Sequence, residues 1–406
     1  MNRIKRQMTT LVAAAVLLVS IGTGIAFGFC PLKAEAAGRP AAISSCLISG
    51  SEVVCQIDAG SVPYSDDGKY YIYADEVYED GPTGDVVATV KAGSSVSVSF
   101  PLNYNAADSN LSRKFLVAMK QGGQMVQVSD EHYITNPEAL AAYTANRMNT
   151  GIKGILPDTT KLDNGDLADL GIQQAVYNMY LDDICSAASV PGAVPFDYNG
   201  QTYYFDGPML ANYDALVKAF NRSGIQVTMV ILNHGTGFYA KDLIHPAAVG
   251  VECEGYALNV ADAAGTNHLK AIGAFLGQRY CGSQGCGQID NWIIGNEVNA
   301  RTSWWYSSSD SLDFNVGIYV KAFRIFYNEL KSKNANVWVY NSIDQEWNRK
   351  SNPGSFLAKD YLDQFNYYML REGNIDWGLS YHPYNSPLYD PYAWNGPAVW
   401  VKDNLK

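Results

Sequence analysis

The feature that most constrains this chain is a regular alternation of apolar strands and amphipathic helices from about residue 150 onward. Residues 225–232 form a continuous apolar run of the kind that parallel sheets bury on both faces. A helical pattern over residues 262–280 follows, and then a second apolar run at residues 289–295. Strands that alternate with helices at these spacings predict βα units and a parallel sheet.

Six strands of this kind can be placed, at residues 152–156, 172–179, 225–232, 289–295, 337–341 and 375–381. They predict an α/β fold, a (β/α)8-type TIM barrel. Only about twenty-five residues follow the sixth strand, so strands seven and eight have no sequence. An open barrel leaves unpaired strand edges. We therefore expect a C-terminally truncated fragment that ends after about six strands.

The region before the barrel has a different pattern. Short alternating runs at residues 69–74 and 95–100 are separated by turn-rich segments. Short strands with frequent turns and no helical period predict a small all-β, sandwich-like domain. The expected organisation is a signal segment at residues 1–37, the β domain at residues 38–136 and the barrel at residues 137–406.

The first segment has the order of a bacterial signal peptide. Basic residues precede an apolar run at residues 11–29, and Ala-Glu-Ala at residues 34–36 supplies a small-x-small cleavage site. We predict a secreted or cell-surface bacterial protein. The apolar run is longer than usual, so an uncleaved N-terminal membrane anchor is the alternative.

Cleavage would leave six cysteines in an oxidising compartment, where disulfides are the default. Cys46 and Cys55 flank a predicted hairpin, and Cys281 and Cys286 enclose a short Gly-Ser-Gln-Gly loop. No histidine lies at zinc-ligand spacing from either pair. These four are the disulfide candidates, with connectivity open, and we expect neither a metal ion nor a cofactor.

Charge and aromatic content narrow the class of partner. Forty acidic and 29 basic residues give a net charge of −11, which repels phosphate backbones and argues against nucleic acid. The chain also holds 28 Tyr and 8 Trp, whose flat apolar bodies and polar tips match sugar rings. We predict an oligosaccharide or polysaccharide as the partner.

Polar residues stand where the apolar strands end. In a βα barrel the chemistry lies at this carboxyl end, and polar groups that are costly in a core suit a concave site. The predicted site residues are Asn178, Asn233, His234, Asn296, Glu297, Asp344, Glu346, Trp347, His382 and Tyr384.

The run Trp-Ile-Ile-Gly-Asn-Glu at residues 292–297 resembles the end of strand four in the clan A glycoside hydrolases. The resemblance implies that Glu297 is the catalytic acid/base and that Asn296 hydrogen-bonds the sugar's 2-hydroxyl. His382 and Tyr384 resemble the His-x-Tyr pair of glycoside hydrolase family 5, which lines the subsite. The strand order agrees, because these motifs fall on predicted strands four and six.

Residues 380–391, with residues 341–344 before them, also look like a bacterial family labelled domain of unknown function 5722. That resemblance spans about residues 140–406 and implies no established substrate.

The function predicted from these patterns is a secreted glycoside hydrolase of the retaining, double-displacement type. Such an enzyme needs a second carboxylate, the nucleophile, at the end of strand seven, and the fragment has no residue there. A non-catalytic carbohydrate-binding or cell-surface barrel is the alternative. An esterase is disfavoured, because the chain has no Gly-x-Ser-x-Gly nucleophile elbow.

Overall fold

The computed structural model describes residues 38–144, 151–157, 162, 165–237, 239–350 and 352–384. All elements given below belong to one compact unit, residues 40–406. The predicted signal segment and the residues after Tyr384 lie outside the described residues. Within the described part, no helix combines the length and apolar character needed to cross a membrane.

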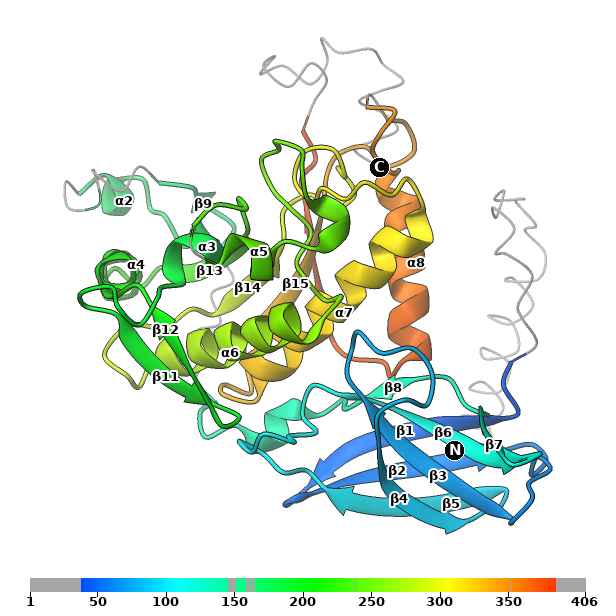
Figure 1. Ribbon diagram of the computed structural model, residues 1–406. Helices are drawn as coiled ribbons and strands as arrows, with labels where there is room; N and C mark the ends of the chain where they lie inside the picture. The colour runs from blue at the N-terminus through cyan, green and yellow to red at the C-terminus, as the bar shows by residue number, and fades with distance from the viewer. Residues whose placement is uncertain are drawn as a thin grey trace, which may run out of the picture. The chain divides into compact units, whose positions relative to one another are not determined.

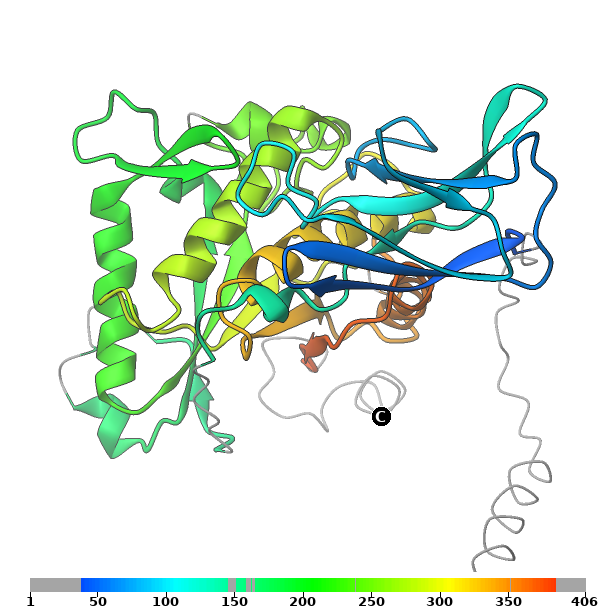
Figure 2. The ribbon, with the colours of Figure 1, turned by 90° about the horizontal axis from the view of Figure 1, so that it is seen from below.

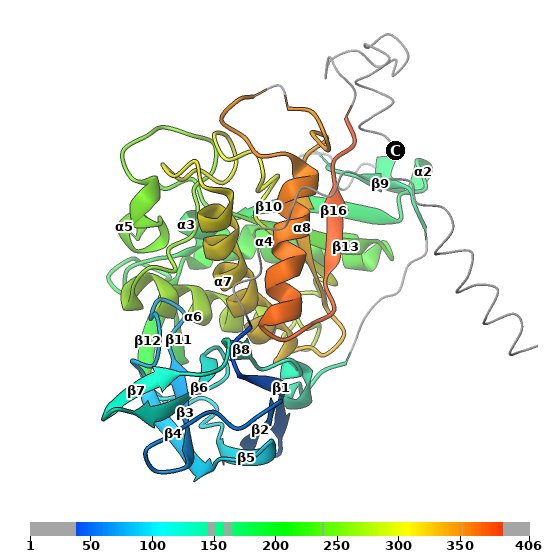
Figure 3. The same cartoon turned by 90° about the vertical axis from the view of Figure 1, so that its right-hand side faces the viewer.

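A six-stranded parallel sheet forms the centre of the second half of the chain (Figure 1). Its strands, in spatial order, are β16 (Gly378–Tyr381), β15 (Trp338–Ile343), β14 (Asn291–Ile294), β13 (Gln226–Leu232), β10 (Gln174–Tyr180) and β9 (Gly154–Ile155). Every neighbouring pair is parallel. The six predicted strands are therefore confirmed as one parallel sheet, with β9 at one edge and β16, seen beside α8 in Figure 3, at the other.

Long helices pack on one face of this sheet. They are α4 (Gly207–Arg222), α6 (Ala263–Arg279), α7 (Leu312–Lys331) and α8 (Ala358–Arg371). Three begin at a side-chain cap, in which Asp206, Asp262 and Ser311 accept a hydrogen bond from the backbone N–H three residues later. Such caps satisfy donors that the first turn leaves unpaired.

The strands bury different residues on their two faces, as alternation along a strand requires. Met229 and Ile231 of β13 join the large core beneath the helices. Val230 and Leu232 lie in a smaller apolar cluster with Ile293 of β14. The sheet is thus apolar on both faces, as the continuous runs in the sequence predicted.

Residues 41–133 form two antiparallel sheets (Figure 2). One contains β1 (Ala41–Ser49), β2 (Glu52–Ala59) and β5 (Ser95–Pro101); the other contains β3 (Lys69–Asp75), β4 (Asp85–Lys91), β6 (Lys114–Gln121), β7 (Gln124–Gln127) and β8 (His132–Tyr133). A separate apolar core includes residues of both sheets, such as Ile57 and Phe115. The all-β character of this region matches the prediction, while the exact boundary at residue 136 stays a prediction.

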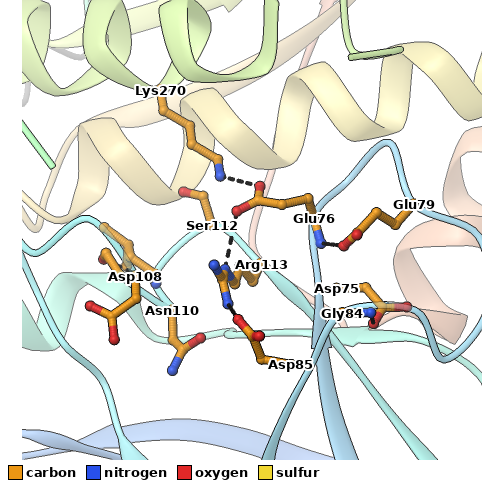
Figure 4. Close-up of polar contacts among 12 residues, drawn as sticks. Asp75, Glu76, Glu79, Gly84, Asp85, Asp108, Asn110, Ser112, Arg113 and Lys270 are labelled. Atoms are coloured by element: carbon orange, nitrogen blue, oxygen red, sulfur yellow. Dashed lines mark hydrogen bonds and ion pairs between the residues drawn. The ribbon is translucent and has the colours of Figure 1, made fainter. Parts of the chain in front are cut away.

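The antiparallel region contacts the helices through charged and polar side chains that are buried or partly buried (Figure 4). Glu76 binds Arg113 at 3.1 Å within the β region, and its other oxygen contacts Lys270 of α6 at 2.5 Å. Ser112 donates to Glu329 of α7 at 2.8 Å.

The remaining elements are short. A hairpin of β11 (Val194–Tyr198) and β12 (Gln201–Phe205) lies between β10 and α4. The others are η1 (Pro137–Leu140), α2 (Asp166–Asp169), α3 (Leu181–Ile184), α5 (Ala240–Leu243) and η3 (Pro246–Ala248).

The four disulfide candidates are free thiols in this structure. Cys46 and Cys55 face each other across β1 and β2 as predicted, but their sulfurs lie 3.4 Å apart, well beyond the S–S bond length of about 2 Å. Cys281 contacts the Gln278 carbonyl, and Cys286 contacts the Gln284 carbonyl. Neither predicted pair is bonded, so both disulfides stay predictions.

Candidate functional site

The predicted site residues lie near the carboxyl ends of five neighbouring parallel strands, β10, β13, β14, β15 and β16; Asn178 lies two residues before the end of β10, and the others lie beyond their strands. Because these strands are parallel, their carboxyl ends share one edge of the sheet. The sequence therefore placed its ten site residues at a common edge. How they are arranged there depends on the turns that follow each strand.

The turn after β14 has an unusual backbone. Gly295 has a φ of 74°, and a Cβ at this position would lie 2.8 Å from Val298 and 3.0 Å from the Trp305 ring. Glu297 has a φ of 44°, a left-handed conformation that non-glycine residues rarely adopt. Such strain persists only where the surroundings enforce it, and it concentrates at functional sites.

This turn brings Glu297 against His382. Oε1 of Glu297 lies 2.8 Å from Nδ1 of His382. Both side chains remain partly accessible, with 14% of Glu297 and 21% of His382 exposed. The His382 backbone N–H donates to the Ile343 carbonyl at 3.0 Å, which ties the residue to the end of β15. The structure thus brings into contact two side chains that were predicted to follow different strands.

Tyr384 extends this pair. Its ring packs edge-on against the His382 imidazole, with centroids 5.8 Å apart. Burial raises the pKa of the Tyr384 hydroxyl, and the nearby Glu297 carboxylate raises it further. The hydroxyl therefore stays protonated at neutral pH and can donate a hydrogen bond.

The residues predicted after β15 are largely buried. Asp344 and Glu346 are 4% and 3% exposed. Burial raises the pKa of Asp344 to about 7; hydrogen bonds from Asn299 and the Glu346 N–H oppose this, and the Glu346 and Glu297 carboxylates add to it. Trp347 packs edge-on against the Tyr381 ring at 6.0 Å.

The residues predicted on β10 and β13 have mixed roles. Asn233 is 2% exposed, and its side chain donates to the Leu243 carbonyl and accepts from the Gly235 N–H, so it stabilises its own loop. The His234 ring stacks on Tyr180, with centroids 3.4 Å apart. Asn178 lies within β10, and its carbonyl accepts a hydrogen bond from the Tyr213 hydroxyl.

Sequence reasoning missed three residues that shape this edge: Asp182, Asn299 and Ser342. Ser342 accepts from the Glu297 N–H at 3.1 Å, and Asn299 pairs with Asp344. Asn299 lies two residues after Glu297, in the same polar segment that ends the strand, and so carried a signal. The sequence carried no signal for the role of Ser342, because that role depends on contacts with the turn after a neighbouring strand.

One cluster has ligand types suited to a metal ion. Donor atoms of Asp182, Asp183 and His234 lie within 4.8 Å of one another. The Asp182 carboxylate already accepts hydrogen bonds from the backbone N–H groups of His234 and Thr236. Those bonds account for its position as a loop stabiliser, so the cluster needs no ion to explain it.

The fold and this site define an α/β protein whose parallel sheet carries a carboxylate–imidazole pair at its carboxyl edge. The chain belongs to the family described as "Family of unknown function (DUF5722)", which matches residues 146–406. The family resemblance predicted from the sequence is therefore confirmed. No curated protein matches the chain by sequence.

Solved structures similar to this chain include glycosidases. The family 1 β-glucosidase from Thermotoga maritima shares 10% identity over 53% of this chain and 43% of its own, with a TM-score of 0.29. A calcium-binding mutant of Bacteroides uniformis β-glucuronidase 2 shares 10% identity over 83% of this chain and 36% of its own, with a TM-score of 0.28. The chain spans less than half the length of either protein.

Proposed function

We propose that this protein is a secreted or cell-surface glycoside hydrolase-like protein that acts on carbohydrate, with Glu297 as the general acid/base. The observation that carries the proposal is the 2.8 Å contact between Glu297 and His382 at the carboxyl edge of a parallel sheet. The left-handed turn at Glu297 supports it, because the chain tolerates strain to hold this carboxylate in place.

The proposal includes a more specific fold. The six parallel strands would be the first six of a (β/α)8 barrel, and the smaller apolar cluster around Val230, Leu232 and Ile293 would face the barrel interior. This assignment places Glu297 after strand four and His382 after strand six. Catalytic residues of such barrels come from the carboxyl ends of several different strands.

In the proposed reaction, the protonated Glu297 donates a proton to the departing glycosidic oxygen as the bond to the anomeric carbon breaks. A second carboxylate, about 5 Å away in retaining enzymes, attacks that carbon and forms a glycosyl–enzyme intermediate. Glu297 then takes a proton from water as the water displaces the carboxylate. We place the nucleophile after strand seven of the complete barrel.

The other residues at the edge would bind the sugar. His382 holds Oε1 of Glu297, so Oε2 would carry the proton that is transferred. Tyr384 offers a protonated hydroxyl beside this carboxylate. Asn296, in the same turn, would hydrogen-bond the sugar's 2-hydroxyl, as the clan A resemblance implies.

The test is Glu297→Gln in the full-length protein, assayed on aryl glycosides with good and poor leaving groups. Loss of the acid should lower kcat/KM about 10²–10⁴-fold on poor leaving groups and much less on good ones. Glu52→Gln, on the exposed side of β2, is the matched control. Equal rates for Glu297→Gln and the control on both substrates would remove Glu297 from the mechanism. Sugar binding without turnover by the unaltered protein would favour the non-catalytic binding protein instead.

A further inference from the structure

The last residues of β15 hold both members of the Glu297–His382 pair. The Ser342 hydroxyl accepts from the Glu297 N–H at 3.1 Å, and the Ser342 carbonyl accepts from the Val298 N–H at 2.9 Å. The next residue, Ile343, accepts the N–H of His382 at 3.0 Å. The two functional residues are therefore attached to adjacent positions of one strand.

Asp344 continues this series. Its Oδ1 accepts from the Asn299 side chain at 2.7 Å, and its backbone N–H donates to Asn299 Oδ1 at 2.9 Å. The Glu346 N–H also donates to the same Asp344 oxygen, at 2.8 Å. Asn299 is fully buried and Asp344 nearly so. A carboxylate enclosed in this way has little surface with which to contact a sugar.

These contacts surround a strained segment. Glu297 adopts a φ of 44°, a conformation that is unfavourable for a non-glycine residue and persists only where the surroundings enforce it. Two contacts enforce this segment: the Ser342 hydroxyl accepts from the Glu297 N–H, and Asp344 binds the side chain of Asn299 two residues later. Together they fix the direction in which the Glu297 side chain leaves the turn.

We propose that Asp344 is a positioning residue, which with Asn299 and Ser342 fixes the turn that directs Glu297 toward His382. This role replaces the substrate-binding role predicted from the sequence. The expected effect of Asp344 on the reaction rate rests on the proposed function of Glu297. Its expected effect on the position of the Glu297 side chain does not.

The structure also supplies a matched pair of variants. Because the pKa of Asp344 is raised to about 7, its carboxyl group is largely protonated in mildly acidic solution. The Asp344→Asn variant is neutral, has nearly the same shape and keeps the oxygen that accepts from Asn299 and Glu346. The Asp344→Ala variant removes that oxygen. The two variants therefore separate the hydrogen-bonding role from the mere presence of a carboxyl group.

The experiment compares crystal structures and rates of Asp344→Asn and Asp344→Ala at about pH 5.5, below the raised pKa. Asp344→Asn should keep the 2.8 Å contact between Glu297 and His382. Its kcat on an aryl glycoside should stay within about threefold of the unaltered protein. Asp344→Ala should lose the contact and about 10–100-fold in kcat, with KM little changed.

Two results would overturn the proposal. One is an intact Glu297–His382 contact in Asp344→Ala. The other is a rise in KM at constant kcat in both variants, which is the behaviour of a substrate-binding residue. If the unaltered protein hydrolyses no glycoside, the proposed function fails while the crystallographic comparison still decides the positioning role. Ser342→Ala, which removes a single hydroxyl, gives the same crystallographic test if Asp344→Ala does not fold.

Discussion

Glu297 and His382 lie 2.8 Å apart, although 85 residues separate them in the chain. They follow β14 and β16, which are not neighbours in the sheet, and β15 lies between those two strands. The contact therefore spans the end of β15. Its geometry depends on two turns and on the strand that they share.

The first prediction concerns the imidazole. His382→Ala should lower kcat on aryl glycosides about 10–100-fold, because Glu297 loses the group that orients its carboxylate. The melting temperature should change little, since the His382 side chain is 21% exposed and leaves no closed cavity. His268→Ala, on α6, provides the control, because His268 contacts the Tyr239 ring rather than Glu297. An unchanged rate in His382→Ala would contradict the prediction.

The second prediction concerns the facing cysteines of β1 and β2. Cys46 and Cys55 are both fully buried, with sulfurs 3.4 Å apart, and burial raises the pKa of the Cys46 thiol. Protein produced in an oxidising compartment should carry this disulfide, seen as a 2 Da loss in the mass of the linking peptide. Oxidation should raise the free energy of unfolding, measured by urea denaturation, by about 2–3 kcal/mol, because the disulfide closes a loop in the unfolded chain.

The control for the cysteine prediction is the double variant Cys46→Ala, Cys55→Ala, whose stability should not respond to reductant. Complete alkylation of both thiols in protein exported to the periplasm would show the prediction to be wrong.

The third prediction concerns a buried carboxyl group in the antiparallel region. Asp75 is fully buried; its Oδ1 accepts from the Gly84 N–H, and its Oδ2 has no hydrogen-bond partner among the described residues (Figure 4). Burial raises the pKa of Asp75 from 3.8 to about 6, and Glu79 contributes in the same direction. Between these two pH values the folded protein binds more protons than the unfolded chain. The stability contributed by Asp75 is therefore complete below about pH 4 and is lost as the pH rises through about 6.

Asp75→Asn should remove this pH dependence, because the amide keeps an acceptor for Gly84 and never ionises. Urea unfolding should show similar stability for the variant and the unaltered protein near pH 4. Above about pH 7 the variant should be more stable by about 1–3 kcal/mol. Asp80→Asn, in the adjacent loop, is the control. A stability difference that is the same at every pH would contradict the assignment to Asp75.

Much of the fold could be predicted because its signals are local. The apolar run at residues 225–232 became β13 (Gln226–Leu232), since a continuous apolar strand fits a sheet buried on both faces. The helix before this strand, α4, begins at Gly207, because Asp206 caps it and Pro208 fits its first turn. Those two residues were visible signals that the helical periodicity did not include.

The hairpin between β10 and α4 was not predicted, although its turn has a strong signal. Asn199 and Gly200 have φ values of 50° and 80°, the conformation that Asn-Gly favours in a two-residue hairpin turn. Insertions of this kind do not follow from the βα repeat.

The sequence predicted where the site residues lie better than it predicted which residues they contact. Strand ends located Glu297, His382 and Asp344, because parallel strands bring their carboxyl ends to one edge. The partner of each side chain depends on turn geometry, so the Asn299–Asp344 pair could not be inferred. A polar residue after a strand looks the same in sequence whether it faces a ligand or holds a neighbouring turn.

The last prediction measures the strain at Glu297 directly. Glu297→Gly and Glu297→Ala both remove the carboxylate and its contact with His382, so they differ mainly in the cost of the 44° φ angle. Glycine adopts this conformation freely, whereas alanine retains a Cβ that disfavours it. Glu297→Gly should therefore be more stable than Glu297→Ala by about 1 kcal/mol in urea unfolding.

Asn366, exposed within α8, gives the opposite control for this comparison. There the alanine variant should be more stable than the glycine variant by about 1 kcal/mol, because glycine loses more backbone freedom in a right-handed helix. If glycine at position 297 is no better than alanine, the turn stores no strain. The carboxylate would then be held by its side-chain contact with His382 alone, and the hydrogen bonds that Ser342 accepts from the Glu297 and Val298 N–H groups would not be needed to enforce the backbone.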